Sequence, residues 1–139
     1  GTPLYMSPEQ AQGQKVDHTS DLFSLGSVRY TMATGRPAFR APSTIAVLRR
    51  VVDDTPRPIQ EINEVLPSWL GDIISKLMSK KKEDRFQTAA ELADLLSRRL
   101  ARLQEPRSST STKSAAASPA KPKIEPGRKS AVSSKVTSA

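Results

Sequence analysis

The side chains with the widest range of chemistry are scarce in this sequence of 139 residues, which has one histidine, His18, and no cysteine. A protein metal site needs several ligands, and His18, next to Asp17, has no second His or Cys to complete one. We therefore predict that His18 is a surface loop residue. The lack of cysteine excludes disulfides and thiolate metal sites and fits a reducing compartment. The remaining chemistry is that of carboxylates, hydroxyls, and ammonium and guanidinium groups.

The elements that must position these groups are predicted to be helices. Ser7 is an N-cap residue, Pro8 suits the first helical position, and Glu9 places an acid in the first turn, so a short helix should begin there. A second helix is expected over Ser20–Thr34, because Gly35-Arg36-Pro37 stops it. Its apolar residues spread around most of the circumference, so this helix is predicted to be buried on nearly all sides.

Three more helices follow from apolar residues at helical spacing. Ser43 can cap a half-exposed helix whose inner face is expected to hold Ile45, Leu48 and Val52. Pro67 leads into a core-facing helix with a wide apolar stripe, formed by Trp69, Leu70, Ile73, Ile74, Leu77 and Met78. Thr88 and Glu91 form a capping box for the last helix, whose inner residues are Leu92, Leu95, Leu96 and Leu100. No segment shows the alternation of a strand, so the fold class is mainly α.

Composition divides the chain near Leu103. All aromatic residues lie in 1–103, whereas 104–139 is rich in Ser, Ala, Lys and Pro and carries seven Lys/Arg against two Glu. Because this tail has few large apolar residues, we predict that it is disordered. Its basic residues could contact nucleic acid or an acidic surface, although a solvated tail is favoured, and its hydroxyls, Ser118 among them, are candidate phosphoacceptors. No apolar run is long enough to span a bilayer, and nothing resembles a signal peptide.

Four motifs in residues 1–86 now carry a resemblance. They are GTPLYMSPEQ at the start, SDLFSLG from Ser20, TGRPAF from Thr34 and EDRF from Glu83. In this order and spacing they resemble the C-terminal lobe of bacterial-type serine/threonine protein kinases, over roughly residues 1–100. The resemblance implies a helical C-terminal lobe of the protein kinase-like fold in 1–103, with the activation segment ending near its start and the disordered tail after it. It also implies an N-terminally truncated kinase domain.

The resemblance assigns Glu9 and Arg85 to a structural ion pair. In this family the glutamate of the first motif pairs with an arginine far along the chain, and Arg85 stands at the matching position. A carboxylate and a guanidinium shielded from water can form bidentate hydrogen bonds. Such a pair would join the substrate-facing segment to the last helices.

Other positions receive supporting roles from the same resemblance. Thr2 is expected to orient the catalytic loop without reacting, and Pro3 and Met6 to shape the pocket for the substrate residue after the phosphoacceptor. Asp21 is expected to hold the catalytic loop in shape from below, although a simple N-terminal helix acid remains an alternative. The resemblance places Val28 and Met32 at the floor of an internal hydrophobic column, and as residues we expect both to be core.

Three positions depart from the pattern of the family. Arg29 replaces an aliphatic residue, so that side of the helix must reach solvent or an acid. Thr31 stands where kinases that select basic substrates often carry Glu, which puts such a preference in doubt. The run 80–82, three lysines in place of a Lys-Asp-Pro turn, is interpreted as a solvated loop, with an anionic contact as the less favoured alternative.

The sequence contains none of the motifs that the family uses for catalysis. These are the Gly-rich loop, the strand lysine with its helix glutamate, the catalytic-loop Asp with its Asn, and the metal-binding Asp-Phe-Gly. By resemblance, the parent, meaning the longer protein expected to contain this chain, is a cytoplasmic kinase that uses ATP and magnesium to phosphorylate Ser or Thr of protein substrates. Whether the parent is anchored to a membrane is left open.

The chain by itself is expected to be inactive and to bind neither ATP nor magnesium, and its partner is expected to be the missing N-terminal part of the kinase domain. Without that part, the second helix should expose an apolar patch, which favours aggregation or loose packing. Two other functions remain open. One is a non-catalytic kinase-like scaffold, and the other is a nucleic-acid binder that acts through the basic tail.

Overall fold

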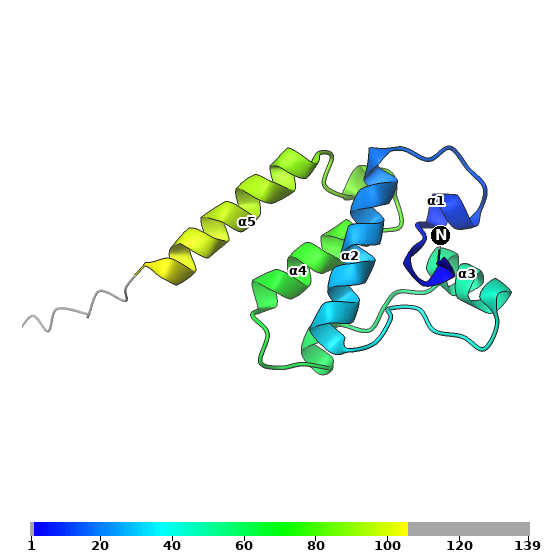
Figure 1. Cartoon of the computed structure of the whole chain (residues 1–139), viewed down its shortest axis with the longest axis horizontal. Helices are drawn as coiled ribbons and strands as arrows, with labels where there is room; N and C mark the ends of the chain where they lie inside the picture. The colour runs from blue at the N-terminus through cyan, green and yellow to red at the C-terminus, as the bar shows by residue number, and fades with distance from the viewer. Residues whose placement is uncertain (1, 106–139) are drawn as a thin grey trace, which may run out of the picture. The chain divides into compact units, whose positions relative to one another are not determined.

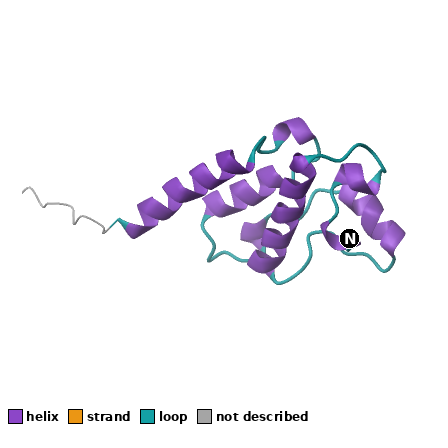
Figure 2. Cartoon of the chain, turned by 45° about the horizontal axis from the view of Figure 1, so that its top comes forward, coloured by secondary structure: helices purple, strands orange, loops and turns teal. Residues whose placement is uncertain are grey.

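The computed structural model describes residues 2–105, and over this range every regular element is helical. The elements are listed in chain order: η1 (Pro3–Tyr5), α1 (Pro8–Ala11), α2 (His18–Thr34), α3 (Thr44–Asp53), η2 (Ile59–Glu61), α4 (Ser68–Leu77), η3 (Lys82–Asp84) and α5 (Ala89–Gln104). Figure 2 shows these helices joined by loops, with no strand in this part of the chain. The prediction of a mainly helical fold is confirmed. The tail interpretation, Ser118 included, falls on residues outside the described range.

The capping residues fix where the helices begin and end. Ser7 and Gln10 form the reciprocal bonds of a capping box at α1, as their spacing predicts. Helix α2 begins earlier than predicted, because Asp17 accepts a hydrogen bond from the backbone of Thr19 and becomes the N-cap. It ends at Gly35, whose φ of 72° lies in the left-handed region that glycine adopts without strain.

Helix α2 is the central element, with α1 and α3 on one side and α4 and α5 on the other (Figure 1). Two clusters of buried side chains share α2 and α4. The larger one includes Phe23, Tyr30, Phe39, Val47, Val51, Ile59, Ile74 and Met78. The smaller one includes Leu22, Ile73, Leu77, Phe86 and Leu92. The apolar stripe that was predicted for the helix after Pro67 is therefore the side of α4 that packs into both clusters.

Helix α2 is not buried on all sides in the described chain, and the apolar patch that we expect on α2 without the rest of the domain is present. Val28 is 41% exposed and Met32 is 79% exposed, and Asp21 on the same side of the helix is exposed too. No element within residues 2–105 covers this side. The expectation that Val28 and Met32 are core residues therefore fails for the described part of the chain.

Two helices turn a different side inward from the one expected. In α3 the buried residues are Val47 and Val51, whereas Ile45 is exposed, because the helix is rotated to pack Val47 and Val51 into the larger cluster. In α5, Leu92 is buried but Leu100 is exposed, since the C-terminal half of this helix extends past the end of α4 (Figure 1).

Gly26 sets the distance between α2 and α4. A Cβ atom at this position would lie 2.7 Å from Cβ of Leu77 and 2.9 Å from Cγ of Met78. Separations this short are far below ordinary van der Waals contact, so α4 can approach only a residue without a side chain.

We predict that Gly26→Ala lowers the free energy of unfolding by about 1–3 kcal/mol, because overpacking outweighs the better helix propensity of alanine. Urea denaturation followed by circular dichroism measures the effect. Met32→Ala, an exposed change on the same helix, is the control and should stay within about 0.5 kcal/mol of the wild type. A stabilised Gly26→Ala variant would show that α2 and α4 do not meet at this glycine.

Candidate functional site

The structure places Glu9 at the first turn of α1 with its side chain only 3% exposed. Pro8 and the Ser7 cap fix the start of the helix, so the carboxylate is directed by a short, well-defined turn. Both of its oxygens are engaged. Oε1 accepts from the hydroxyl of Ser20 at 2.6 Å and from Arg85, and Oε2 accepts a second bond from Arg85.

The guanidinium of Arg85 is completely buried and uses all five of its N–H groups. Nη1 lies 2.7 Å from Oε1 of Glu9, and Nη2 lies 2.9 Å from Oε2, so the pair is bidentate. The remaining donors bind the backbone carbonyls of Ser79, Thr19 and Lys80. No donor is left unpaired, which is what makes a buried cation tolerable.

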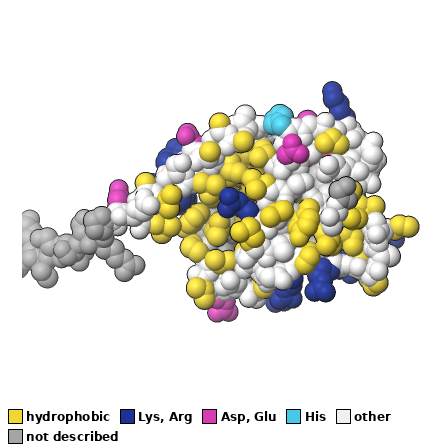
Figure 3. Space-filling view, viewed as in Figure 1, with side chains coloured by type: hydrophobic (Ala, Val, Ile, Leu, Met, Phe, Trp, Pro, Cys, Tyr) yellow, Lys and Arg dark blue, Asp and Glu magenta, His cyan; other side chains and the backbone are white. Residues whose placement is uncertain are grey.

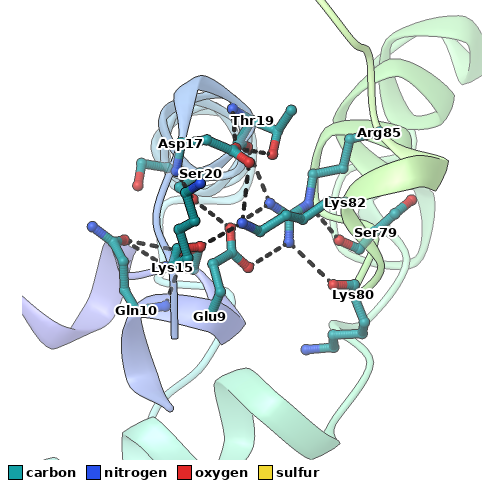
Figure 4. Close-up of polar contacts among 12 residues, drawn as sticks. Glu9, Gln10, Lys15, Asp17, Thr19, Ser20, Ser79, Lys80, Lys82 and Arg85 are labelled. Carbon is teal, nitrogen blue, oxygen red and sulfur yellow. Dashed lines mark hydrogen bonds and ion pairs between the residues drawn. The ribbon is translucent and has the colours of Figure 1, made fainter. Parts of the chain in front are cut away.

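These contacts join three parts of the chain that are distant in sequence (Figure 4). Glu9 belongs to α1, Ser20 to the first turn of α2, and Arg85 to the loop before α5. The ring of Phe23 lies under the guanidinium, with Cζ of Arg85 5.0 Å from its centroid. We call the set Glu9, Ser20 and Arg85 the ionic junction.

The ionic junction lowers the pKa of Glu9. Burial by itself would raise it, but the hydrogen bonds from Arg85 and Ser20 outweigh burial and bring the pKa from an ordinary value of 4.5 to about 2. Glu9 is therefore ionised throughout the physiological range.

A second, more exposed set of contacts lies beside the junction (Figure 4). Nζ of Lys82 lies 3.1 Å from a carboxylate oxygen of Asp17 and donates to the carbonyl of Lys15 at 2.6 Å. Hydrogen bonds from Thr19 and Lys82 lower the pKa of Asp17. His18 is exposed at the first position of α2, and its Nε2 lies 2.7 Å from the carbonyl oxygen of Gln87.

The interpretation of 80–82 as a solvated loop is wrong for two of its three lysines. Besides Lys82, Lys80 donates to the carbonyl of Val51 and lies over the ring of Phe39, 4.3 Å from its centroid. Burial lowers the pKa of Lys80 to about 8. Only Lys81 is exposed.

The other predicted site residues are not gathered at the ionic junction. Thr2 is exposed, and Pro3 and Met6 are half-buried around η1. Asp21 lies on the exposed side of α2 with Val28 and Met32.

A hollow of about 450 Å³, lined in part by Tyr30, Ile59 and Met78, contains none of the predicted site residues. Among residues 2–105 no group of His, Asp and Glu is arranged to hold a metal ion. None of the helices there combines the length and the apolar character needed to cross a membrane.

Comparison with known proteins decides the family. The model of the protein kinase domain matches residues 1–109. This chain belongs to the protein kinase domain family. It is 43% identical over 97 residues to the serine/threonine-protein kinase PknB of Mycobacterium tuberculosis, an alignment that covers 69% of this chain and 16% of the relative.

Relatives from other bacteria agree. A Clostridium acetobutylicum protein named "Probable serine/threonine-protein kinase" is 39% identical over 97 residues, covering 70% of this chain and 15% of its own length. The Mycolicibacterium smegmatis PknB is 41% identical over 97 residues, covering 69% and 16%. The chain thus spans about a sixth of the length of the curated relatives that it matches.

Sequence reasoning missed other members of the contacts described above. Ser20 was expected only to begin a helix, yet its hydroxyl completes the shell of Glu9. The contact between Asp17 and Lys82 was also missed, because the two residues are far apart in sequence and no motif links them. The one available signal was the pair of capping residues at 17 and 20, which indicates an earlier helix start.

We predict that Arg85→Ala destabilises the chain by about 3–5 kcal/mol, because it leaves the Glu9 carboxylate buried without its cation. Arg49→Ala is the matched control, since Arg49 is exposed on α3. Thermal unfolding of the two variants measures the difference. Equal losses in melting temperature would contradict a stabilising role for the ionic junction.

The lowered pKa of Glu9 also predicts how stability depends on pH. Since its pKa is lower in the folded chain than in the unfolded one, its contribution is complete above about pH 4.5 and is lost as the pH falls toward 2. Glu9→Gln should flatten this part of the stability curve, whereas Glu64→Gln, an exposed change, should leave it unaltered. Denaturant unfolding between pH 7 and about pH 2 tests this, and parallel curves for Glu9→Gln and the wild type would refute it.

Proposed function

We propose that residues 1–103 form the helical C-terminal lobe of a serine/threonine protein kinase domain, on the side that receives the protein substrate, and that 104–139 is a separate basic tail. The observation that carries the proposal is the buried bidentate pair of Glu9 and Arg85 inside the region that the family matches. The pair holds α1 against the loop before α5, and the hydroxyls of Ser24 and Ser27 hold η1 against α2 by donating to the carbonyls of Tyr5 and Leu4. A segment held in this way has the fixed backbone that substrate recognition requires.

The proposed roles of the remaining residues follow from their positions. Thr2 is proposed to orient the catalytic loop, and Pro3 and Met6 to contact the substrate residue after the phosphoacceptor. Asp21 is proposed to support the catalytic loop from below, while Val28 and Met32 form the floor of the hydrophobic column. Asp21, Val28 and Met32 lie on one uncovered side of α2. This exposure supports the proposal that another part of the domain packs against that side.

The parent is proposed to transfer the γ-phosphoryl group of ATP, with magnesium, to Ser or Thr hydroxyls of protein substrates in the cytoplasm. The present chain is proposed to be inactive by itself, since the sequence contains none of the ATP-binding or base motifs of the family. The missing N-terminal part of the domain is its proposed partner. A non-catalytic kinase-like scaffold remains the second candidate, favoured by the dense packing of the ionic junction, which needs no nucleotide.

The proposal is tested by measuring phosphoryl transfer by the parent kinase domain and by the 139-residue chain. The coding sequence upstream supplies the parent domain, which should transfer phosphate from ATP to casein, whereas the 139-residue chain should show no transfer. By calorimetry, that chain should have no affinity for magnesium ATP up to about 1 mM. ATP binding by the isolated chain would contradict the proposal. A parent domain that folds but transfers no phosphate would establish the scaffold instead.

A further inference from the structure

Exposed apolar side chains gather on one face formed by α2, α4 and α5. Leu100 and Leu103 of α5, which are 55% and 64% exposed, line this face together with Arg29 of α2 and Trp69 of α4. Figure 3 shows a broad apolar area over these helices with a basic side chain in its middle. We call the surface made by Arg29, Trp69, Leu70, Leu96, Leu100 and Leu103 the open face. An apolar area of this kind typically marks a surface that another element covers.

The open face is hollowed between its helices. A depression of about 330 Å³ is lined by Arg29 of α2, by Trp69 and Leu70 of α4, and by Leu96, Leu100 and Leu103 of α5. Positions 96, 100 and 103 follow the i, i+4, i+7 spacing of a ridge. Ridges of this spacing pack into the grooves between the side chains of another helix.

Arg29 brings a positive charge with an unpaired hydrogen-bond donor into the depression. Its Nε is buried and finds no hydrogen-bond partner within residues 2–105. No acidic residue lines the depression, and the nearby Arg99 lies over the ring of Trp69 at 5.8 Å. A buried guanidinium donor left unpaired is unfavourable, so the group that covers this face must supply an acceptor.

We infer that the open face seats a helix from the remainder of the kinase domain, and that this helix carries an Asp or Glu that binds Arg29. The inference rests on the proposed function, which makes that remainder the partner of this chain. A carboxylate is the fitting acceptor, because it satisfies the donor and balances the charge at once.

The isolated chain offers the first test. Arg29→Leu should raise its melting temperature by several degrees, because the substitution removes an unpaired buried donor from an apolar surface. Arg99→Leu is the matched control. It should not raise the melting temperature, because the substitution removes the contact of the guanidinium with the ring of Trp69. A fall in melting temperature for Arg29→Leu would overturn the inference.

Binding of synthetic helices offers the second test. Three peptides of about 18 residues share Leu at i, i+4 and i+7 and differ only in a central Glu, Gln or Lys on the apolar side. Trp69, the only tryptophan, reports binding to the full chain by its fluorescence. We expect the Glu peptide to bind about tenfold more tightly than the Gln peptide and the Lys peptide to bind most weakly. With Arg29→Leu the preference for Glu should disappear.

Several outcomes would overturn the inference. They are equal affinity for the Glu and Gln peptides, no binding of any peptide at about 1 mM, dimerisation of the chain through this face, and binding of the face to vesicles of phosphatidylcholine and phosphatidylglycerol in place of the peptides. An upstream coding sequence with no acid on the apolar side of any predicted helix would overturn it as well. None of these results requires catalysis, so failure here is distinguishable from failure of the proposed kinase activity.

Discussion

The fold depends on one buried ion pair and on the hydrogen bonds that make it tolerable. Glu9 and Arg85 are 76 residues apart in sequence, and each would be costly to bury alone. The bidentate contact with Glu9 and three backbone carbonyls satisfy every donor of the guanidinium, and the Ser20 hydroxyl donates to the carboxylate. Because all of these groups must be present together, the junction fixes the positions of α1, the start of α2 and the loop before α5 at once.

Helix packing supports this arrangement next to the junction. Helix α2 contributes Phe23 to the larger buried cluster and Leu22 to the smaller one, and α4 contributes Ile74 and Ile73 in the same way. Gly26 allows the two helices to approach closely. The polar junction and the apolar core thus meet at the first turns of α2, where Phe23 lies beneath Arg85.

Local signals in the sequence predicted much of the fold. The caps at Ser7 and Thr88 and the apolar stripe of α4 indicated helices at the right places, because such signals act within a few residues. The contact of Glu9 with Arg85 could be anticipated only from a family resemblance. The contacts of Ser20, Lys80 and Lys82 were missed, since they join segments that only the folded chain brings together. Apolar periodicity by itself placed Val28 and Met32 in the core, because it does not say which side has a neighbour, whereas the family resemblance indicated an exposed apolar patch on this helix.

A double-mutant cycle between Glu9 and Arg85 tests the central claim most directly. The wild type, Glu9→Gln, Arg85→Met and the double variant are unfolded in urea at pH 7, and the coupling energy is the departure from additivity. If the pair holds the two segments together, each single change should be costly, and the double change should cost less than their sum by about 2–3 kcal/mol. Additive effects, with a coupling energy near zero, would contradict the account.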